Sequence, residues 1–584
     1  MDADTSNQGP QEPRTYSVSG DAASREALRS LREQITAAKA ARAAAPLLQK
    51  AVAAMQKNDF RRGRQLVERA LKEDPDNGIG LHLLAICHEK ADEWLAALDA
   101  YERALAHAPD SPEIANDLGR LAFRMGMLRQ AEKLFRYHLS QRANAPESAN
   151  NLACVLREQL RYEEAIDLLK PVIMAHPEKA LLWNTLGTIL SDMGECEQAA
   201  IFYSETLRLE PSHLKARYNR ANALYTLGQT EQAIEDCKSA MLQTPSPHEK
   251  ASMELALSSM LLASGHIREG WRAYEARLSP YFHDPIEFQI DRPRWDRIQS
   301  LEGKSLLLVG EQGLGDEILF ANIIEDLLSA LGPKGRLTLA VEHRLVPLFQ
   351  RSFPGVKVGA HATRKQAGRH YRSVPWLAEA GEIDLFTAMA EPLEAFRGDL
   401  ESFPERPQGF LKADPARVAY WREAFRALPG PKIGLLWTSM VINSTRKKYF
   451  APFERWGPIL SRKGATFVSL QYGDCTRDLA WARQKHGVDI HMPPGVDLRN
   501  DLDEVAALCC AMDLVLGPAN ATSNIAAACG APTWLITAPG AWPQLGTPRY
   551  PFYSQARVFA SGAFGDWDPV IGAVAEALTE RLSL

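Results

Sequence analysis

The first half of the chain repeats itself every 34 residues, and this period restricts its fold more than any other feature of the sequence. Small residues recur at that spacing at Ala85, Gly119, Ala153, Gly187 and Ala221. A second small-residue series follows at Ala97, Ala131, Ala165, Ala199 and Ala233. Prolines keep the same period at Pro75, Pro109, Pro177, Pro211 and Pro245, with Ala143 at the remaining position. Three series in phase at one period indicate a stack of similar supersecondary units.

A unit of this length, with small residues at two positions and a terminal proline, is typical of the tetratricopeptide repeat. The small residues allow the two helices of a unit to cross closely, and the proline ends the second helix. Five clear units run from about Gly78 to Pro247, with a weaker unit before them and a degenerate one through "GHIREGWRAYEARL". The sequence therefore predicts an all-α superhelix over residues 25–281, after a disordered tail over residues 1–24.

An asparagine recurs near the middle of the first helix of successive repeats, at Asn116, Asn150, Asn184 and Asn219. The first helices line the inner groove of such an array. A row of amides there can hydrogen-bond the backbone of an extended peptide without requiring a particular sequence. The alternative is that each asparagine caps or solvates its own helix. In either case the repeats predict a protein-binding function.

The second half changes to apolar strands that alternate with helical patterns, after a connecting segment over residues 282–303. The predicted strands are Ser305–Gly310, Arg336–Val341, Val356–Gly359, Lys432–Trp437, Thr466–Gln471, Asp513–Pro518 and Thr533–Ala538. They form two βαβ series, which predicts two Rossmann-like α/β lobes facing a cleft, over residues 304–415 and 416–584. Ligands of such folds bind at the carboxyl ends of the strands. The loops after these strands are therefore the candidate site.

Four of these loops carry side chains suited to ligand binding or catalysis. The first contains Glu311, Gln312, Gly313, Leu314, Gly315 and Asp316. The second contains Trp437, Thr438, Ser439, Arg446, Lys447 and Lys448, and the third contains Gln471 and Tyr472. The fourth contains Pro518, Asn520, Thr522, Ser523 and Asn524. The fourth loop opens a helix, whose backbone N–H groups can bind an anion together with the hydroxyl groups. The first loop is neither a dinucleotide fingerprint nor a Walker loop, because its glycines fall as GxxGxG without a following lysine.

Bulk properties exclude several classes of protein. The net charge of −5 and the pI near 6.3 give no general attraction to nucleic acid or anionic lipid. A polar N-terminus and the lack of any apolar run of membrane-spanning length predict a cytoplasmic protein that does not insert into membranes. The eight cysteines are scattered without a CxxC pair, so we expect no metal site.

The segments "GEQGLGDEILFA", "GLLW", "VSLQYGD", "DLVLGPANATSNIAAACGAPTWLI" and the late "PRYPFY…ARVF…DW" resemble, in order and spacing, those of bacterial GT-B glycosyltransferases that carry tetratricopeptide repeats. The second half is similar to the lobe pair of heptosyltransferases, and the layout resembles that of the eukaryotic O-GlcNAc transferase. Within this group, the chain resembles alphaproteobacterial flagellin-modifying enzymes. That resemblance implies a repeat domain that recognises flagellin. It also implies a GT-B domain that adds a nonulosonic acid, such as pseudaminic acid, from a CMP-linked donor. In that domain, the lobe over residues 304–415, with the first loop, would bind the acceptor, and the donor lobe over residues 416–584, with the second, third and fourth loops, would bind the nucleotide sugar.

The resemblance also implies roles for single residues. The Gly-Leu-Gly-Asp run of heptosyltransferases matches Gly313 to Asp316, and its aspartate is the proposed base there. Asp316 would accordingly take the proton of the acceptor hydroxyl. Glu311 in the same turn is the reserve base. The alternative role of Asp316 is to cap a helix that begins at Glu317.

The fourth loop departs from the family pattern, in which an Asp-Thr pair is followed, four residues after the threonine, by a histidine. The corresponding residues here are Ala519, Asn520 and Asn524. Neutral groups at a helix N-terminus, with a cation nearby, suit a donor that carries one phosphate and a sugar carboxylate. The basic run over 446–448 could supply that cation. Because no carboxylate pair follows a strand of the donor lobe, we expect a metal-independent reaction.

The leading prediction is a protein O-glycosyltransferase that modifies Ser or Thr of flagellin, using a nucleotide sugar and no cofactor. Two alternatives stay open. One is a GT-B enzyme that uses a UDP- or ADP-sugar on a lipid-linked or polysaccharide acceptor, for which a peptide groove is a poor match. The other is an inactive repeat scaffold or chaperone. The intact Gly313–Asp316 run argues against this alternative.

Overall fold

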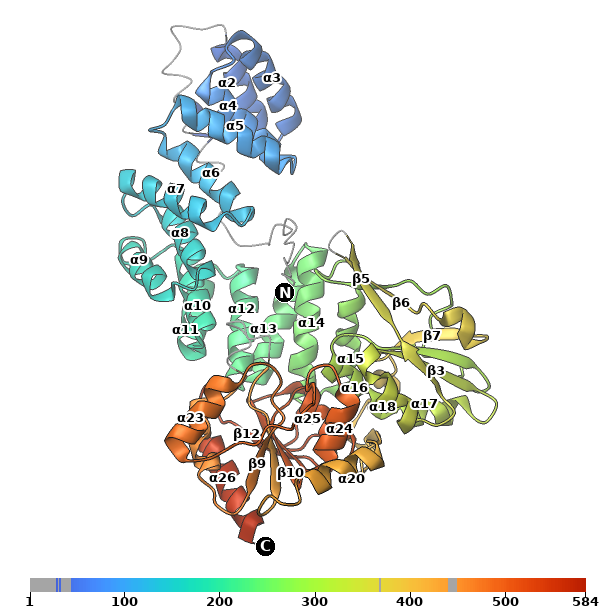
Figure 1. Ribbon diagram of the computed structural model, residues 1–584. Helices are drawn as coiled ribbons and strands as arrows, with labels where there is room; N and C mark the ends of the chain where they lie inside the picture. The colour runs from blue at the N-terminus through green and yellow to red at the C-terminus, as the bar shows by residue number, and fades with distance from the viewer. Residues whose placement is uncertain (1–27, 30, 33–43, 367–368, 440–448, 584) are drawn as a thin grey trace. The chain divides into compact units, whose positions relative to one another are not determined.

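The computed structural model describes residues 28–29, 31–32, 44–366, 369–439 and 449–583 (Figure 1). The expected tail over residues 1–24 and the predicted donor-binding residues Arg446, Lys447 and Lys448 lie outside these ranges. The chain divides into two compact units, Met1–Ala216 and Arg217–Leu584. Within the described ranges, no helix combines the length and the apolar character needed to cross a membrane.

The first unit is built from helices that pack as antiparallel pairs. They are α2 (Ala45–Met55), α3 (Phe60–Glu73), α4 (Gly78–Lys90), α5 (Trp94–His107), α6 (Pro112–Arg124), α7 (Leu128–Gln141), α8 (Pro146–Glu158), α9 (Tyr162–Ala175), α10 (Ala180–Met193) and α11 (Cys196–Leu209). A Cβ atom on Gly119 would lie 2.9 Å from the ring of Phe135, and one on Gly187 would lie 2.9 Å from the ring of Tyr203. These close helix crossings need the small residues, which confirms the predicted all-helical tetratricopeptide array.

Helix pairs continue into the second unit. After α12 (Leu214–Thr226), they comprise α13 (Thr230–Gln243), α14 (Pro247–Ala263) and α15 (Ile267–Tyr274), followed by the short 3-10 helix η1 (Glu275–Leu278). Trp271 on α15 is buried, and its indole N–H donates to the carbonyl of Arg397 at 2.9 Å. The Trp271 ring also packs edge-to-face on Phe320 and Trp542. The degenerate last repeat is thus part of the core of the α/β region.

The first sheet of this region has four parallel strands in the order β4-β3-β2-β7. The strands are β2 (Ser305–Val309), β3 (Arg336–Val341), β4 (Lys357–Ala360) and β7 (Leu385–Ala388), and the connecting helices are α16 (Leu314–Phe320), α17 (Ile324–Leu331), α18 (Val346–Ser352) and α19 (Leu393–Phe396). Leu306 and Leu308 point into the core that contains α17 and α18, whereas Leu307 and Val309 belong to a separate cluster on the opposite face.

The opposite face of the first sheet is covered by a small sheet that we did not predict. It contains β1 (Ile286–Phe288), β6 (Arg369–Ser373) and β5 (Ala362–Gln366), in that order. Strand β1 lies in the segment 282–303, which we expected to be a linker. All of β5 is exposed, so its side chains lack the apolar alternation by which a strand is recognised in a sequence.

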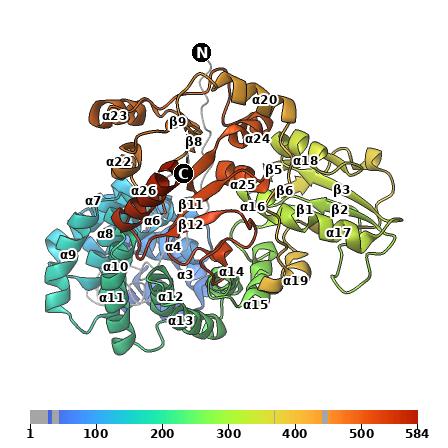
Figure 2. The same cartoon turned by 90° about the horizontal axis from the view of Figure 1, so that it is seen from below.

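The second sheet has five parallel strands in the order β12-β11-β10-β8-β9. The strands are β8 (Lys432–Leu435), β9 (Thr466–Ser469), β10 (Leu514–Pro518), β11 (Thr533–Thr537) and β12 (Arg557–Ala560), and the helices are α20 (Pro415–Ala424), α22 (Gly457–Leu460), α23 (Thr476–His486), α24 (Leu502–Ala511), α25 (Ala521–Ala528) and α26 (Asp568–Ser583). Helices α23 and α26 lie on one side of this sheet, and α20 and α24 lie on the other (Figure 1, Figure 2). The two parallel sheets with their helices confirm the predicted α/β architecture.

Candidate functional site

Three of the four predicted loops lie at the points where the strand order of a sheet reverses. In the first sheet, the chain winds outward from β2 through β3 to β4 and then adds β7 on the other side of β2. In the second sheet, it passes from β8 to β9 and then places β10 on the other side of β8. Loops at the carboxyl ends of strands diverge at such a point and leave room for a ligand. The loops after β2, β8 and β10 are therefore correctly placed for a binding site.

Asp316 in the first loop caps its own helix. Helix α16 begins at Leu314, three residues earlier than the Glu317 start that we predicted. The Asp316 carboxylate accepts a hydrogen bond from the backbone N–H of Gly313 at 3.2 Å. It also lies in the first turn, where the helix dipole favours a negative charge. Asp316 thus makes a capping contact, but as the third residue of α16 and not as the N-cap that we weighed against catalysis, a position that Gly313 occupies.

The surroundings of Asp316 come from both sheets. The side-chain amide of Asn524, on α25, donates to the carbonyl of Gly315 at 3.0 Å and so joins the first loop to the fourth. Burial and the nearby Asp316 carboxylate raise the pKa of Tyr550 and of Tyr553. Both tyrosines are buried and stack on each other at 5.7 Å. Asp316 therefore lies where the two halves of the α/β region meet.

Three buried polar atoms in the fourth loop and the tyrosine pair have no hydrogen-bond partner among the described residues. They are Asn520 Nδ2, Asn524 Oδ1 and the hydroxyl of Tyr553. Buried polar groups in native proteins are nearly always satisfied by protein, water or ligand. An unsatisfied set of this kind is what a polar ligand would complete. The motif "PRYPFY" contains both tyrosines, but nothing in its sequence marked them as site residues.

The second and third loops are held together by Gln471. Its side-chain oxygen accepts from the backbone N–H groups of Trp437 and Thr438, both at 3.0 Å. The Trp437 side chain is buried and donates to Asp478 at 2.7 Å. Tyr472 donates weakly to Ser439 at 3.5 Å. Trp437 and Gln471, predicted to bind the donor, thus use their polar side-chain groups to shape the loops.

Ser523 and Asn520 are also used within the protein. The Asn520 side-chain oxygen accepts from the backbone N–H of Ser523 at 3.2 Å, and the Ser523 hydroxyl donates to the carbonyl of Pro518 at 2.8 Å. Thr522 is buried next to them. The fourth loop is therefore rigid, with Asn520 as the N-cap of α25.

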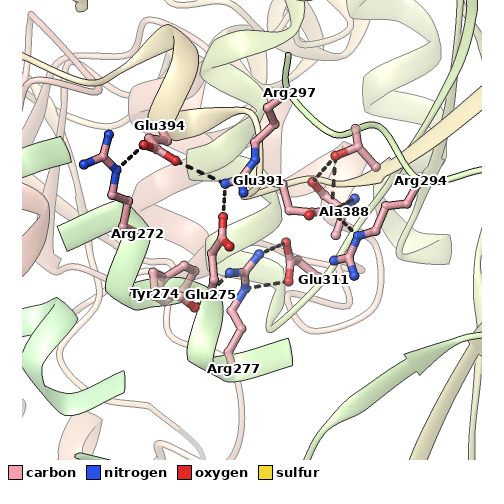
Figure 3. Close-up of polar contacts among 11 residues, drawn as sticks. Arg272, Tyr274, Glu275, Arg277, Arg294, Arg297, Glu311, Ala388, Glu391 and Glu394 are labelled. Carbon is pink, nitrogen blue, oxygen red and sulfur yellow. Dashed lines mark hydrogen bonds and ion pairs between the residues drawn. The ribbon is translucent and has the colours of Figure 1, made fainter. Parts of the chain in front are cut away.

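Glu311, the reserve base, is tied to the last repeat (Figure 3). Its carboxylate is fully buried and receives two hydrogen bonds from the guanidinium of Arg277, at 2.8 and 2.7 Å. It also accepts from the backbone N–H of Ala390 at 2.8 Å. A carboxylate with these partners is not accessible to an acceptor hydroxyl, which argues against a role as base. Sequence reasoning missed Arg277, because it lies in the last repeat, whose pattern has degenerated.

Further ion pairs fix the loop after β7 to α15 and to the segment 282–303 that follows the array (Figure 3). Arg272 and Arg297 both contact Glu394, at 2.6 and 3.2 Å. Arg294 contacts Glu391 at 2.9 Å, and Glu391 accepts from the backbone N–H of Ala388 at 2.8 Å. The loops after β2 and β7 are therefore both anchored to residues around η1.

The asparagine row joins neighbouring repeats where its contacts are described. The side-chain oxygen of Asn116 accepts from Ser148 of the next first helix at 2.9 Å. That of Asn150 accepts from Thr185 one repeat further on, at 2.5 Å. Asn184 is buried and Asn219 is half-buried. The row lies on α6, α8, α10 and α12, as predicted, and at least two of its members contribute to packing between repeats.

Comparison with known proteins relates both halves of the chain to others. Two models of the tetratricopeptide repeat match, one over residues 48–112 and 184–246 and the other over residues 90–152. The peroxisomal targeting signal receptor of Kluyveromyces lactis is 27% identical over 186 residues, which are 31% of this chain and 32% of the receptor. A solved tetratricopeptide repeat protein from Parabacteroides merdae is 14% identical with a TM-score of 0.35, covering 40% of this chain and 91% of that one.

A further relative matches from the repeats through the α/β region. Protein FlbA of Caulobacter vibrioides is 46% identical over 562 residues, which cover 96% of this chain and 94% of that protein. Identity at this level over nearly the full length of both proteins shows common descent of the repeats and the α/β region together. The chain belongs to the family of Protein FlbA.

Proposed function

We propose that this protein is a GT-B-type O-glycosyltransferase that moves a sugar from a nucleotide donor to Ser or Thr of a protein, with flagellin as the acceptor. The repeat array would bind the acceptor protein, and the α/β region would carry the reaction. The observation that carries the proposal is the meeting of the first and fourth loops around Asp316. It joins a carboxylate to a set of unsatisfied buried polar atoms.

In the proposed reaction, the acceptor hydroxyl oxygen forms a bond to the anomeric carbon of the sugar. The bond between that carbon and the phosphate oxygen breaks, and the nucleotide leaves with the electron pair. Asp316 takes the hydroxyl proton as the new bond forms. Asp316 Oδ2 accepts a hydrogen bond from the backbone N–H of Gly313 at 3.2 Å, so the proposed base also holds the start of α16.

The proposed donor is a CMP-linked nonulosonic acid. The fourth loop offers neutral amide groups of Asn520 and Asn524 where a standard UDP- or ADP-sugar site would carry an acid and an imidazole. The unpaired Asn520 Nδ2 is a neutral hydrogen-bond donor, which suits a ligand that already carries a phosphate and a carboxylate, because a further acid in the site would repel it. The Asn524 amide N–H group instead donates to the carbonyl of Gly315.

The proposed acceptor is a protein rather than a glycan. Tetratricopeptide arrays are protein-binding modules, and this one continues into the core that supports the first loop. Arg277 and Glu311 connect the end of the array directly to that loop.

The test is the intact mass of purified flagellin after incubation with the full-length protein and CMP-pseudaminic acid. The wild type is expected to add one or more sugar increments. Asp316→Asn keeps an oxygen that can cap Gly313 but has no basic carboxylate, so we expect its rate to fall at least about 100-fold. Asp291→Asn, at an exposed position outside the site, serves as the matched control and should leave the rate unchanged.

Two outcomes would contradict the proposal. If Asp316→Asn transfers sugar at the wild-type rate, Asp316 is only a cap and the assigned mechanism is wrong. If the wild type adds no mass with CMP-, UDP- or ADP-linked sugars but still binds flagellin, the protein is a scaffold or chaperone. Activity that is lost with a chelator and restored by magnesium would contradict the proposed metal-independent reaction.

A further inference from the structure

A cavity of about 550 Å³ opens beside the first loop, at the carboxyl ends of β2, β3 and β4. Its wall includes Gln312 and Glu317 from the first loop and helix α16, and Glu342 and His361 from the ends of β3 and β4. Arg372 of β6 also lines this cavity. The proposed reaction uses none of these side chains. We call this space the Arg372 cavity.

Arg372 is a buried cation, and burial lowers its pKa against the attraction of the nearby Glu317 and Glu311 carboxylates. It is 6% exposed, and it makes no ion pair with a carboxylate in the described ranges. Its Nε donates to the hydroxyl of Thr363 at 3.1 Å, and its Nη1 donates to the carbonyl of Gly310. A buried charge that only neutral groups contact is costly, and in native proteins it is normally paired or used for binding.

The remaining nitrogen of this guanidinium is free for a ligand. Nη2 makes no hydrogen bond within the described residues, and it is not among the polar atoms that are sealed from solvent. Since Arg372 itself is buried and lines the cavity, the cavity is where Nη2 is accessible. Its two N–H groups can bind an oxyanion there.

The carboxylates of the cavity wall form no ion pair with Arg372 in the described ranges, and each has another partner; Asp284 contacts His370 Nδ1 at 3.5 Å. Glu317 contacts His361 Nε2 at 2.9 Å and accepts from the backbone N–H of Glu342 at 2.8 Å. Glu342 accepts from the backbone N–H and the Nε of Arg344, at 2.8 and 2.9 Å. The cavity therefore offers an unpaired positive charge next to carboxylates that are internally satisfied.

A further group can bind the uncharged part of a ligand. Gln312 is exposed and lines the cavity, and it holds a left-handed backbone with φ of 62°, a conformation that is unfavourable for a residue with a side chain. An amide near one cation suits a hydroxyl group next to an anionic group.

From these contacts we infer that the Arg372 cavity binds the carboxylate of a polyhydroxylated acid, with Arg372 on the carboxylate and Gln312 on a neighbouring hydroxyl group. This assignment rests on the proposed function, because it identifies the ligand with the acidic sugar of the donor. A phosphate group has the same charge preference and is the competing source of the anion. The cavity does not suit a metal ion, since the described residues include no group of three or more His, Cys, Asp or Glu side chains placed to hold one.

The test is calorimetric binding of free N-acetylneuraminic acid to the full-length protein, compared with its methyl ester and with inorganic phosphate. The acid is expected to bind, and the ester, which lacks the charge, to bind at least tenfold more weakly. Arg372→Gln should weaken binding of the acid at least tenfold. Arg364→Gln on the adjacent strand β5, where the arginine is exposed and contacts Gln289 at 3.2 Å, is the control and should bind the acid like the wild type.

Equal binding of the acid and the ester, or full affinity in a folded Arg372→Gln protein, would overturn the inference. So would binding of phosphate in the absence of any binding of the acid, which would assign the cavity to a phosphate group. The comparison of acid and ester uses only the wild type, so it decides the question even if Arg372→Gln does not fold. Binding that persists in a protein without transferase activity would separate this inference from the proposed function.

Discussion

The first and fourth loops of the α/β region have the same layout, but they differ in whether their polar side chains already have hydrogen-bond partners. Each leaves a buried parallel strand at a switch point and enters a short helix. In the first loop, Glu311 and Asp316 both accept hydrogen bonds from the protein. In the fourth, Asn520 and Asn524 each retain a buried amide atom without a partner in the described chain. Residue types alone would have ranked the acidic loop as the reactive one, yet the amide loop holds more unused hydrogen-bonding capacity.

The largest expected effect comes from removing the support of the first loop. Arg277→Ala leaves the fully buried Glu311 carboxylate without a counter-ion, so we expect a loss of about 3–5 kcal/mol in the free energy of unfolding. Urea denaturation followed by tryptophan fluorescence measures this loss. Arg272→Ala is the control, because that side chain is 63% exposed and its ion pair with Glu394 should contribute less than about 1 kcal/mol. Equal losses in the two variants would show that Glu311 does not depend on Arg277.

A smaller effect is expected where Asp316 caps α16. Asp316→Ala removes the acceptor for the Gly313 N–H and a favourable charge in the first turn, at a cost of about 1 kcal/mol. Asp316→Asn keeps an acceptor oxygen and should lose less. Denaturation midpoints of the two variants make the comparison. If Asp316→Ala is as stable as the wild type, the capping bond is not significant in solution and the carboxylate is freer than the structure suggests.

The contact between the two loops should contribute less still. Asn524→Ala breaks the hydrogen bond to the Gly315 carbonyl but also removes the buried, unpaired Oδ1 atom. These effects oppose each other, so we expect a loss below about 1 kcal/mol. Asn500→Ala, at an exposed position, is the control. A loss well above that of a single hydrogen bond would mean that Asn524 is a main link between the lobes.

The smallest effect at neutral pH is expected at Tyr553, whose hydroxyl is buried without a described partner. Tyr553→Phe should change the free energy of unfolding by less than about 0.5 kcal/mol at pH 7. Burial raises the pKa of Tyr553 well above 10, so above pH 10 the unfolded chain loses a proton that the folded chain keeps. Stability of the wild type should then fall as the pH rises.

The Tyr553→Phe variant has no such proton, so its free energy of unfolding should fall less steeply with pH. The slopes of the wild type and the variant should differ by at most about 1.4 kcal/mol per pH unit. Denaturation between pH 9 and pH 11 measures both slopes. Tyr281→Phe, at an exposed position, should follow the wild type. Identical slopes in Tyr553→Phe and the wild type would indicate that the Tyr553 hydroxyl is open to solvent.

Regular elements with strong periodicity were predictable. The repeat pattern located the helix pairs, and the start of β3 at Arg336 and its end at Val341 agree with the prediction. Strand β7 was missed because "LFTA" is too short to show a pattern, and β5 and β6 because they are polar. Their absence from the prediction mattered, since β7 creates the switch point beside Glu311 and β6 carries Arg372.

The sequence by itself determined the repeat array, the two parallel sheets and the loops at their carboxyl ends. It could do so because helix and strand periodicity, glycine turns and proline breaks act over short stretches of chain. Only the tertiary structure decided which polar groups in those loops are already engaged. Arg277 meets Glu311, Asn524 meets Gly315 and Arg372 meets Gly310 across separations of 34, 209 and 62 residues. Whether a buried charge is paired depends on such distant contacts, which no local pattern encodes.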